Sequence, residues 1–163
     1  TRGGEGFKQQ LKSLNWERLG MAQLANSVSA CAIRKALEYA EDREQFGQPI
    51  VEFQGLRWKI AEMVKRLEAS RALTYRAGEQ AIAEGRVPDP LQATVAKLFA
   101  TETVEHIVDE ALQVHGANGY QQGHPLEYLY RTVRGYRIAG GTDEIMRNTI
   151  MRLVERNGMP DLV

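Results

Sequence analysis

The sequence predicts an all-α fold, an antiparallel four-helix-type bundle with a short extra helix. Three long segments carry apolar residues at steps of three, four or seven positions, which is the spacing of one face of an amphipathic helix. Clusters of glycine and proline separate these segments, and such clusters end helices. No stretch of alternating polar and apolar residues indicates a strand. Long helices joined by short links favour a bundle.

The first predicted helix starts at Phe7 and ends near the letters EQFGQP at residues 44–49, where a glycine and a proline interrupt its apolar pattern. A second helix follows from Phe53 toward Gly85. Both patterns last for many turns, so we expect two long neighbouring helices that run in opposite directions.

The link GRVPDP, residues 85–90, ends in a proline that suits the first turn of a third long helix. The letters HGANGYQQGHP at residues 115–125 end that helix, and Pro125 opens a short fourth one. We expect Thr142 together with Asp143 to cap a fifth helix.

The composition suits a single domain, because 43% of the 163 residues are hydrophobic. Lysine plus arginine and aspartate plus glutamate number 21 each, so no overall charge favours nucleic acid or an anionic membrane. No stretch approaches the roughly 20 apolar residues of a membrane span, so we expect no membrane insertion. The chain begins at Thr1 in letters typical of a loop interior, which indicates a fragment of a longer protein.

Cysteine and histidine do not indicate a metal centre. Cys31 is the only cysteine, which excludes an internal disulfide and fits a reducing compartment. His106, His115 and His124 lie nine positions apart and form no ligand pair at helical spacing. The sequence therefore predicts no metal site.

An acidic residue stands near the apolar side of the first helix. Glu17 lies three positions after Leu14 and four before Met21, so helical spacing places it close to the apolar stripe. A buried carboxylate has a raised pKa and can act as a general base or acid. An ion pair with Arg18, with a neighbouring lysine or with a residue on another helix would explain the same residue without any catalytic function.

Three further segments combine polar or glycine residues with helix ends. Arg43 can interact with the helix dipole or bind a phosphate, with Phe46 as an apolar face beside it. The glycine-rich letters at residues 116–119 can stop a helix or let a ligand approach the main chain. The letters IAGGTDEIM at residues 138–146 offer free backbone N–H groups at a helix start, which can hold an anion or simply be capped.

In their joint order these segments resemble the C-terminal helical domain of the acyl-CoA dehydrogenase family. The run R-x-x-F-G with a glutamine eleven positions after its arginine, and the late turn G-T-x-E-I, carry most of the resemblance. It covers nearly the whole chain, so residues 1–163 are identified as that domain, and the family's N-terminal helical and middle β domains are absent from them. The matching letters are ERL, DREQFG, FQ, LQVHGANGY and IAGGTDEIMRN.

The resemblance implies FAD as cofactor and assigns residues to it. Arg43 and Gln54 are similar to the pair that reaches across a dimer to the pyrophosphate and adenosine half of FAD, and Phe46 matches the aromatic residue beside them. Gln113 matches a glutamine that contacts the cofactor of a neighbouring subunit. Ala117 stands where a main-chain contact is often made by glycine.

The last turn is implied to touch the flavin of its own subunit through Thr142 and Glu144. Glu144 replaces a frequent glutamine, so when ionised it accepts hydrogen bonds but donates none.

The catalytic base is the departure from the common family pattern. That pattern has a glutamate directly before G-T, where this chain has Gly140. A minority pattern, seen in isovaleryl-CoA and long-chain members, has a small residue there and a glutamate on the first helix before an arginine, as in Glu17 and Arg18. The resemblance therefore implies Glu17 as the α-proton base, the Gly140 N–H as a donor to the thioester carbonyl, and Arg18 as a substrate-binding residue or a structural charge.

The implied activity is α,β-dehydrogenation of an acyl-CoA thioester, with electron-transfer flavoprotein as acceptor and full-length chains assembled as tetramers or dimers. A non-catalytic or heteromeric partner subunit of the same fold, and an oxidase-type relative, remain as alternatives. The isolated domain is expected to be inactive. We expect a cytoplasmic location, with the mitochondrial matrix as the alternative.

Overall fold

The computed structural model describes residues 5–159, with side chains from residue 13 onward. Within that part of the chain the α-helices are α1 (Glu5–Asp42), α2 (Gln54–Ala83), α3 (Pro90–His115), α4 (Pro125–Tyr136) and α5 (Asp143–Asn157). Single 3₁₀ turns occupy η1 (Ile50–Glu52) and η2 (Gly116–Asn118). No helix in the described residues has both the length and the apolarity needed to cross a bilayer.

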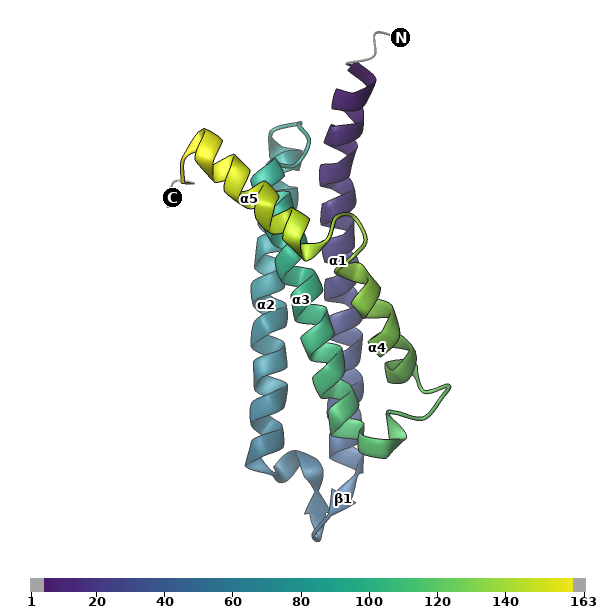
Figure 1. Ribbon diagram of the computed structural model, residues 1–163. Coiled ribbons are helices and arrows are strands. Elements are labelled where there is room, and N and C mark those ends of the chain that lie inside the picture. The colour runs from purple at the N-terminus through teal and green to yellow at the C-terminus, as the bar shows by residue number, and fades with distance from the viewer. Residues whose placement is uncertain (1–4, 160–163) are drawn as a thin grey trace.

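The helices form the predicted antiparallel bundle (Figure 1). α1 and α2 run in opposite directions and are joined at one end of the bundle, and α3 returns along both of them. α4 packs on α3 and α1, and α5 crosses over α3 near the other end. The short link between α4 and α5 reaches back to α3, where the carbonyl of Gly141 accepts a hydrogen bond from Lys97.

The helix starts follow the predicted capping chemistry. Pro90 is the first residue of α3, and Oδ1 of Asp89 accepts hydrogen bonds from the N–H groups of Leu91 and Gln92 at 2.9 and 3.0 Å. Pro125 likewise opens α4. Thr142 is the N-cap of α5, and its hydroxyl accepts from the Ile145 N–H at 3.4 Å. The predicted helix starts at these three positions are confirmed.

A small hairpin, which the sequence reading missed, joins α1 to η1. β1 (Glu44–Gln45) pairs antiparallel with β2 (Gln48–Pro49). The two residues at its tip, Phe46 and Gly47, have φ of +54° and +84°, as two-residue hairpins with the native twist require. Strands of two residues are too short to produce an alternating pattern, so only the helix break was predictable. Residues 43–49 are called the hairpin below.

Alanine builds the contact between α1 and α3. Small side chains allow two helices to approach closely along their whole length. Larger apolar residues, among them Met63, Ile107 and Leu126, are fully buried around this seam and fill the space toward α2 and α4. The alanines with 0–1% exposure are Ala22, Ala25, Ala32, Ala36 and Ala40 on α1 and Ala93, Ala96, Ala100 and Ala111 on α3.

Candidate functional site

The link between α4 and α5, residues 138–142, is called the α4–α5 turn. Gly140 and Gly141 both have left-handed backbone angles, with φ of +67° and +108°. A Cβ placed on Gly140 would meet no atom within 4 Å, whereas one on Gly141 would lie 2.5 Å from Cε of Met146. The turn is therefore packed on its Gly141 side and open on its Gly140 side.

A buried lysine supports this turn from α3. The side chain of Lys97 is fully buried, and its Nζ donates a hydrogen bond to the carbonyl oxygen of Gly141 at 2.8 Å. Burial lowers the pKa of Lys97, because a charged ammonium is poorly solvated there, and the carboxylate of Asp143 partly opposes that effect. The backbone of the turn is thus bonded directly to a charged group of the core.

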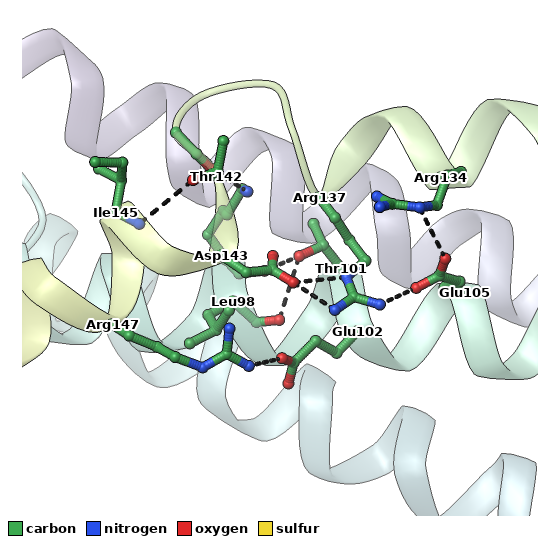
Figure 2. Close-up of polar contacts among 12 residues, drawn as sticks. Leu98, Thr101, Glu102, Glu105, Arg134, Arg137, Thr142, Asp143, Ile145 and Arg147 are labelled. Carbon is green, nitrogen blue, oxygen red and sulfur yellow. Dashed lines mark hydrogen bonds and ion pairs between the residues drawn. The ribbon is translucent and has the colours of Figure 1, made fainter.

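Charged side chains of three helices hold the base of the turn (Figure 2). Arg137 points between Asp143 and Glu105, donating from Nε to Oδ2 of Asp143 at 2.6 Å and pairing with Glu105 on α3. These hydrogen bonds, first that of Glu105 and then that of Asp143, raise the pKa of Arg137. Asp143 is 4% exposed. The expectation that Asp143 caps α5 with Thr142 is therefore only half right: Thr142 caps, and Asp143 forms a buried ion pair.

Arg18 and Glu17 occupy different environments on α1. Arg18 is half-buried, its Nη1 donates to the hydroxyl of Thr94 on α3 at 3.1 Å, and burial lowers its pKa. Glu17 is exposed. The expectation that Glu17 lies close to the apolar stripe is wrong for this chain, because the buried stripe follows Asn15, Leu19 and Ala22.

Arg18 nevertheless comes together with the support of the α4–α5 turn, while Glu17 precedes it directly on α1. Arg18 is bonded to Thr94, and Lys97 three positions later is bonded to Gly141. Residues three apart on a helix face the same side, so both contacts are made over one turn of α3. The positive charge of Arg18 also contributes to the lowered pKa of Lys97, which agrees with their proximity.

Thr142 and Glu144 follow the two glycines at the start of α5. The Glu144 side chain is exposed, and its pKa is lowered because its own backbone N–H and the Thr142 hydroxyl donate hydrogen bonds to the carboxylate. Glu144 is therefore ionised at neutral pH and acts as an acceptor only, as its identity suggested.

The other predicted cofactor residues lie at the opposite end of the bundle. Arg43 and Ala117 line one hollow of about 330 Å³, together with Tyr39 and Asn118. The Asn118 amide donates to the Tyr39 hydroxyl at 2.9 Å, which fixes the glycine-rich stretch after α3 against α1. In sequence Arg43 and Ala117 are far apart, and the fold makes them neighbours.

Phe46 projects from the tip of the hairpin. Its side chain is 95% exposed and makes a T-shaped contact with the ring of Phe53, with ring centroids 6.1 Å apart. Gln54, the first residue of α2, and Gln113, near the end of α3, are both exposed at this end of the bundle but do not line the hollow.

The candidate residues thus form two groups and not one pocket. Glu17 lies in the first half of α1 and Arg43 just beyond its end, so the groups are separated by about 40 Å along that helix. The first group holds Glu17, Arg18, Gly140, Thr142 and Glu144, and the second holds Arg43, Phe46, Gln54, Gln113 and Ala117.

The sequence reading passed over Lys97 and Arg137, the two cations that hold the α4–α5 turn. A signal for Lys97 was present, because it stands among Ala93, Ala96 and Ala100 on the apolar side of its helix, where a lysine needs a partner. No comparable signal marked Arg137, whose partners come from another helix and from beyond the turn.

Two of the three histidines, His115 and His124, have structural explanations. His115 is buried, stacks on the ring of Tyr39 with centroids 4.4 Å apart, and shares a hydrogen bond of 2.8 Å between Nδ1 and the carbonyl of Ala111. His124 lies beside it and accepts the N–H of Leu126 at the start of α4. Among the described residues no three His, Cys, Asp or Glu side chains gather as a metal site would require.

Comparison with known proteins places the whole bundle in one family. The family model for the acyl-CoA dehydrogenase C-terminal domain matches residues 4–154. The 3-sulfinopropanoyl-CoA desulfinase of Cupriavidus necator is 39% identical over 145 residues, 89% of this chain and 36% of the relative. A caffeyl-CoA reductase–Etf complex subunit of Acetobacterium woodii is 34% identical, with 90% of this chain and 38% of the relative covered.

The structure of butyryl-CoA dehydrogenase from Megasphaera elsdenii superposes with a TM-score of 0.88 at 32% identity, covering 94% of this chain and 39% of that one. This chain therefore spans little more than a third of the length of these proteins. Both its sequence and its fold match their C-terminal part. The chain belongs to the acyl-CoA dehydrogenase family, as its C-terminal helical domain.

Proposed function

We propose that this chain serves an FAD-dependent acyl-CoA dehydrogenase, in which Glu17 removes the α-proton of an acyl-CoA thioester. One observation carries the proposal: Arg18, directly after Glu17, and Gly141, directly after the open Gly140, are both bonded to one turn of α3, through Thr94 and Lys97. The N-terminal helical and middle β domains would come from the remainder of the full-length protein.

The chemistry requires a base and a donor at the thioester. The proton of the α C–H bond passes to a carboxylate oxygen of Glu17, the freed electron pair forms the double bond, and the β-hydrogen leaves as hydride. The thioester oxygen gains negative charge during this step, and a backbone N–H at Gly140 stabilises it without any side chain. FAD, when bound, supplies the acceptor for the hydride.

The glycine at position 140 suits both the cofactor and a base on another helix. Nothing lies within 4 Å of a Cβ placed there, so the turn leaves room for a ligand and for an approaching carboxylate. Glu17 is exposed in this chain, and a base needs a dry pocket to raise its pKa. Water would therefore be excluded by the parts of the protein outside this chain.

The two residue groups suit two contacts with FAD. Thr142 and Glu144 would hold the flavin of their own subunit, and the group around Arg43 would reach the FAD of a neighbouring subunit. Phe46 suits the second contact, because its ring is 95% exposed at the tip of the hairpin on a backbone with φ of +54°, which is strained for an aromatic residue. This arrangement implies a dimer or tetramer of full-length chains.

The comparisons support the remaining expectations. The similarity to a subunit of a reductase–Etf complex favours electron-transfer flavoprotein as the redox partner. The bacterial sources of the relatives favour the cytoplasm over the mitochondrial matrix.

A second candidate is loss of a sulfino group, because the relative from C. necator is named a 3-sulfinopropanoyl-CoA desulfinase. Hydrolytic removal would break the C–S bond, place a proton on that carbon and release hydrogen sulfite. No electrons would pass to an outside acceptor. This activity would explain a turn without the usual glutamate at Gly140 and would give Glu17 no base function.

The test uses the full-length protein, as wild type, Glu17→Gln and the control Glu38→Gln, an exposed glutamate on the same helix. Straight and branched acyl-CoA thioesters and 3-sulfinopropanoyl-CoA are added anaerobically while flavin bleaching and sulfite are measured. We expect wild type and Glu38→Gln to bleach, and Glu17→Gln to keep its FAD but bleach at least about 100-fold more slowly.

Other outcomes select the alternatives. Equal bleaching by Glu17→Gln would exclude Glu17 as the base. Sulfite release without bleaching would establish the desulfinase candidate. Oxygen consumption during turnover in a parallel aerobic assay would indicate an oxidase-type relative. A wild type that binds FAD but reacts with no thioester would favour the non-catalytic or heteromeric subunit.

A further inference from the structure

We propose that Lys97 is a positioning residue: it fixes the peptide unit between Gly141 and Thr142 so that the Thr142 N–H points away from α3, toward a ligand in the α4–α5 turn. The ligand part of this inference rests on the proposed function above. The positioning part concerns this chain alone and can be tested without a ligand.

The burial of Lys97 is the first argument. An ammonium group taken out of water is costly unless it is hydrogen-bonded and paired. A methionine has a side chain of similar length and no charge, so it would fill the same space without the desolvation cost of an ammonium group. The Nζ of Lys97 reaches the Gly141 carbonyl at 2.8 Å, so the charge is used on the backbone of the turn, 44 positions away in sequence.

Charge balance around Lys97 is the second argument. Asp143 faces it with a carboxylate that is 4% exposed, while Arg18 and Arg137 bring further positive charge to the same region. Oδ2 of Asp143 is bonded to Arg137, but Oδ1 has no hydrogen-bond partner among the described residues. The carboxylate therefore acts on Lys97 through space and keeps an ammonium tolerable in the core.

The geometry of the peptide bond gives the direction. A trans peptide unit is planar, with its C=O and N–H on opposite sides, and the described residues contain no cis peptide bond. Because the Gly141 carbonyl is directed at Lys97 in α3, the N–H of Thr142 in the same unit is directed away from α3. Among the described residues this N–H has no backbone acceptor.

The two glycines explain why such support is needed. Glycine has access to more backbone conformations than any other residue, and Gly140 and Gly141 follow one another at φ of +67° and +108°. Two consecutive glycines do not fix the orientation of the peptide that follows them. Lys97 supplies the missing restraint from the core, while Met146 closes the Gly141 side.

The positioning part is tested in this 163-residue chain by NMR. The residual dipolar coupling of the Thr142 N–H bond, measured against the couplings of α2 and α3, reports the direction of that bond. We expect Lys97→Met to change it while the helix couplings stay the same, and Lys97→Arg to keep it. Lys65→Met, at an exposed lysine on α2, is the matched control and should change nothing. An unchanged Thr142 coupling in Lys97→Met would overturn the inference.

The ligand part is tested in the full-length flavoprotein with the same variants. We expect Lys97→Met to lower kcat per bound flavin by about 100-fold, with little change in the KM for acyl-CoA, and Lys97→Arg to restore most of it. A lysine that only stabilised the fold would lower flavin content or Tm and leave kcat per flavin unchanged, which would overturn this part. A wild type without any acyl-CoA turnover would refute the proposed function, and the NMR result would still decide the positioning.

Discussion

The α4–α5 turn and the hairpin are both short glycine-containing reversals that carry candidate site residues, yet the chain supports them very differently. The carbonyl of Gly141 in the turn is bonded to the buried Lys97 of α3, and the residues on either side of the turn, Arg137 and Asp143, form an ion pair that extends to Glu105 of α3. The hairpin lies at the end of the bundle, and residues 41–48 are all exposed. The conformation of the turn is therefore fixed by this chain, whereas the side chains of the hairpin are left for something outside it.

This contrast agrees with the two kinds of contact that we propose. A group that stabilises a developing charge must be held in place before the reaction, because reorganisation during it would reduce the benefit. A residue that reaches a neighbouring subunit needs only a stable base and an exposed tip. In the hairpin the ladder from Glu44 to Pro49 and the backbone bond of 2.8 Å from Ile50 to Arg43 supply that base.

The largest expected effect tests whether buried charge holds the turn. Arg137→Met leaves Asp143 and Glu105 close together without their shared partner, and we expect it to lower the free energy of unfolding by about 3 kcal/mol. Arg147→Met is the control, because it breaks a pair with the more exposed Glu102 and should cost less than about 1 kcal/mol. Urea denaturation of this chain measures both. Equal losses of unfolding free energy in the two variants would mean that the ion pairs of Arg137 stabilise the protein no more than an exposed surface pair does.

A smaller effect separates the two sides of the turn. Gly141→Ala combines a left-handed backbone with a contact against the fully buried Met146, and we expect a loss of about 2 kcal/mol in the free energy of unfolding. Gly140→Ala meets only the backbone penalty and should lose about 1 kcal/mol. Thermal or urea unfolding of the two variants gives the difference. A larger loss for Gly140→Ala would contradict an open side at that residue.

The smallest effect on stability concerns the hairpin. Phe46→Ala removes a side chain that is 95% exposed, so the free energy of unfolding of this chain should change by less than about 0.5 kcal/mol. Phe53→Ala, at a half-buried ring packed on the core, is the control and should lose about 2 kcal/mol. In the full-length protein we expect the opposite order for FAD affinity: Phe46→Ala should weaken FAD binding more than Phe53→Ala, as measured by FAD titration. A Phe46→Ala variant with undiminished affinity would contradict its proposed contact with FAD.

The fold was predictable from particular residues. Pro90 after Asp89, Pro125 after the glycine-rich stretch, and Thr142 before α5 each mark a helix start by local chemistry, and each was confirmed. The hairpin was not predictable beyond the break in the helix, because its strands are two residues long.

The candidate site was predictable only in part. Glu17, Gly140 and the residues around Arg43 follow from motif order, and their roles remain predictions. The prediction that Glu17 lies near the apolar stripe was wrong. Helical spacing from Leu14 and Met21 suggested it, but in the packed helix the buried positions are those of Asn15 and Leu19. The support of the turn by Lys97 and Arg137 was missed because hydrogen-bond partners far apart in the chain leave no local pattern.

The sequence by itself determined where helices begin and end, which faces are apolar, and which letters mark the two glycine-containing reversals. These properties depend on neighbours within a few turns, so a periodicity of 3.6 residues and local capping are enough to specify them. Only the tertiary structure decided that Arg18 meets Thr94 across 76 positions and that Lys97 meets Gly141 across 44. A buried charge is tolerated only when hydrogen-bond and charge partners surround it. Here those partners come from distant parts of the chain, so the packing of the helices brings them together and spacing along the sequence does not reveal them.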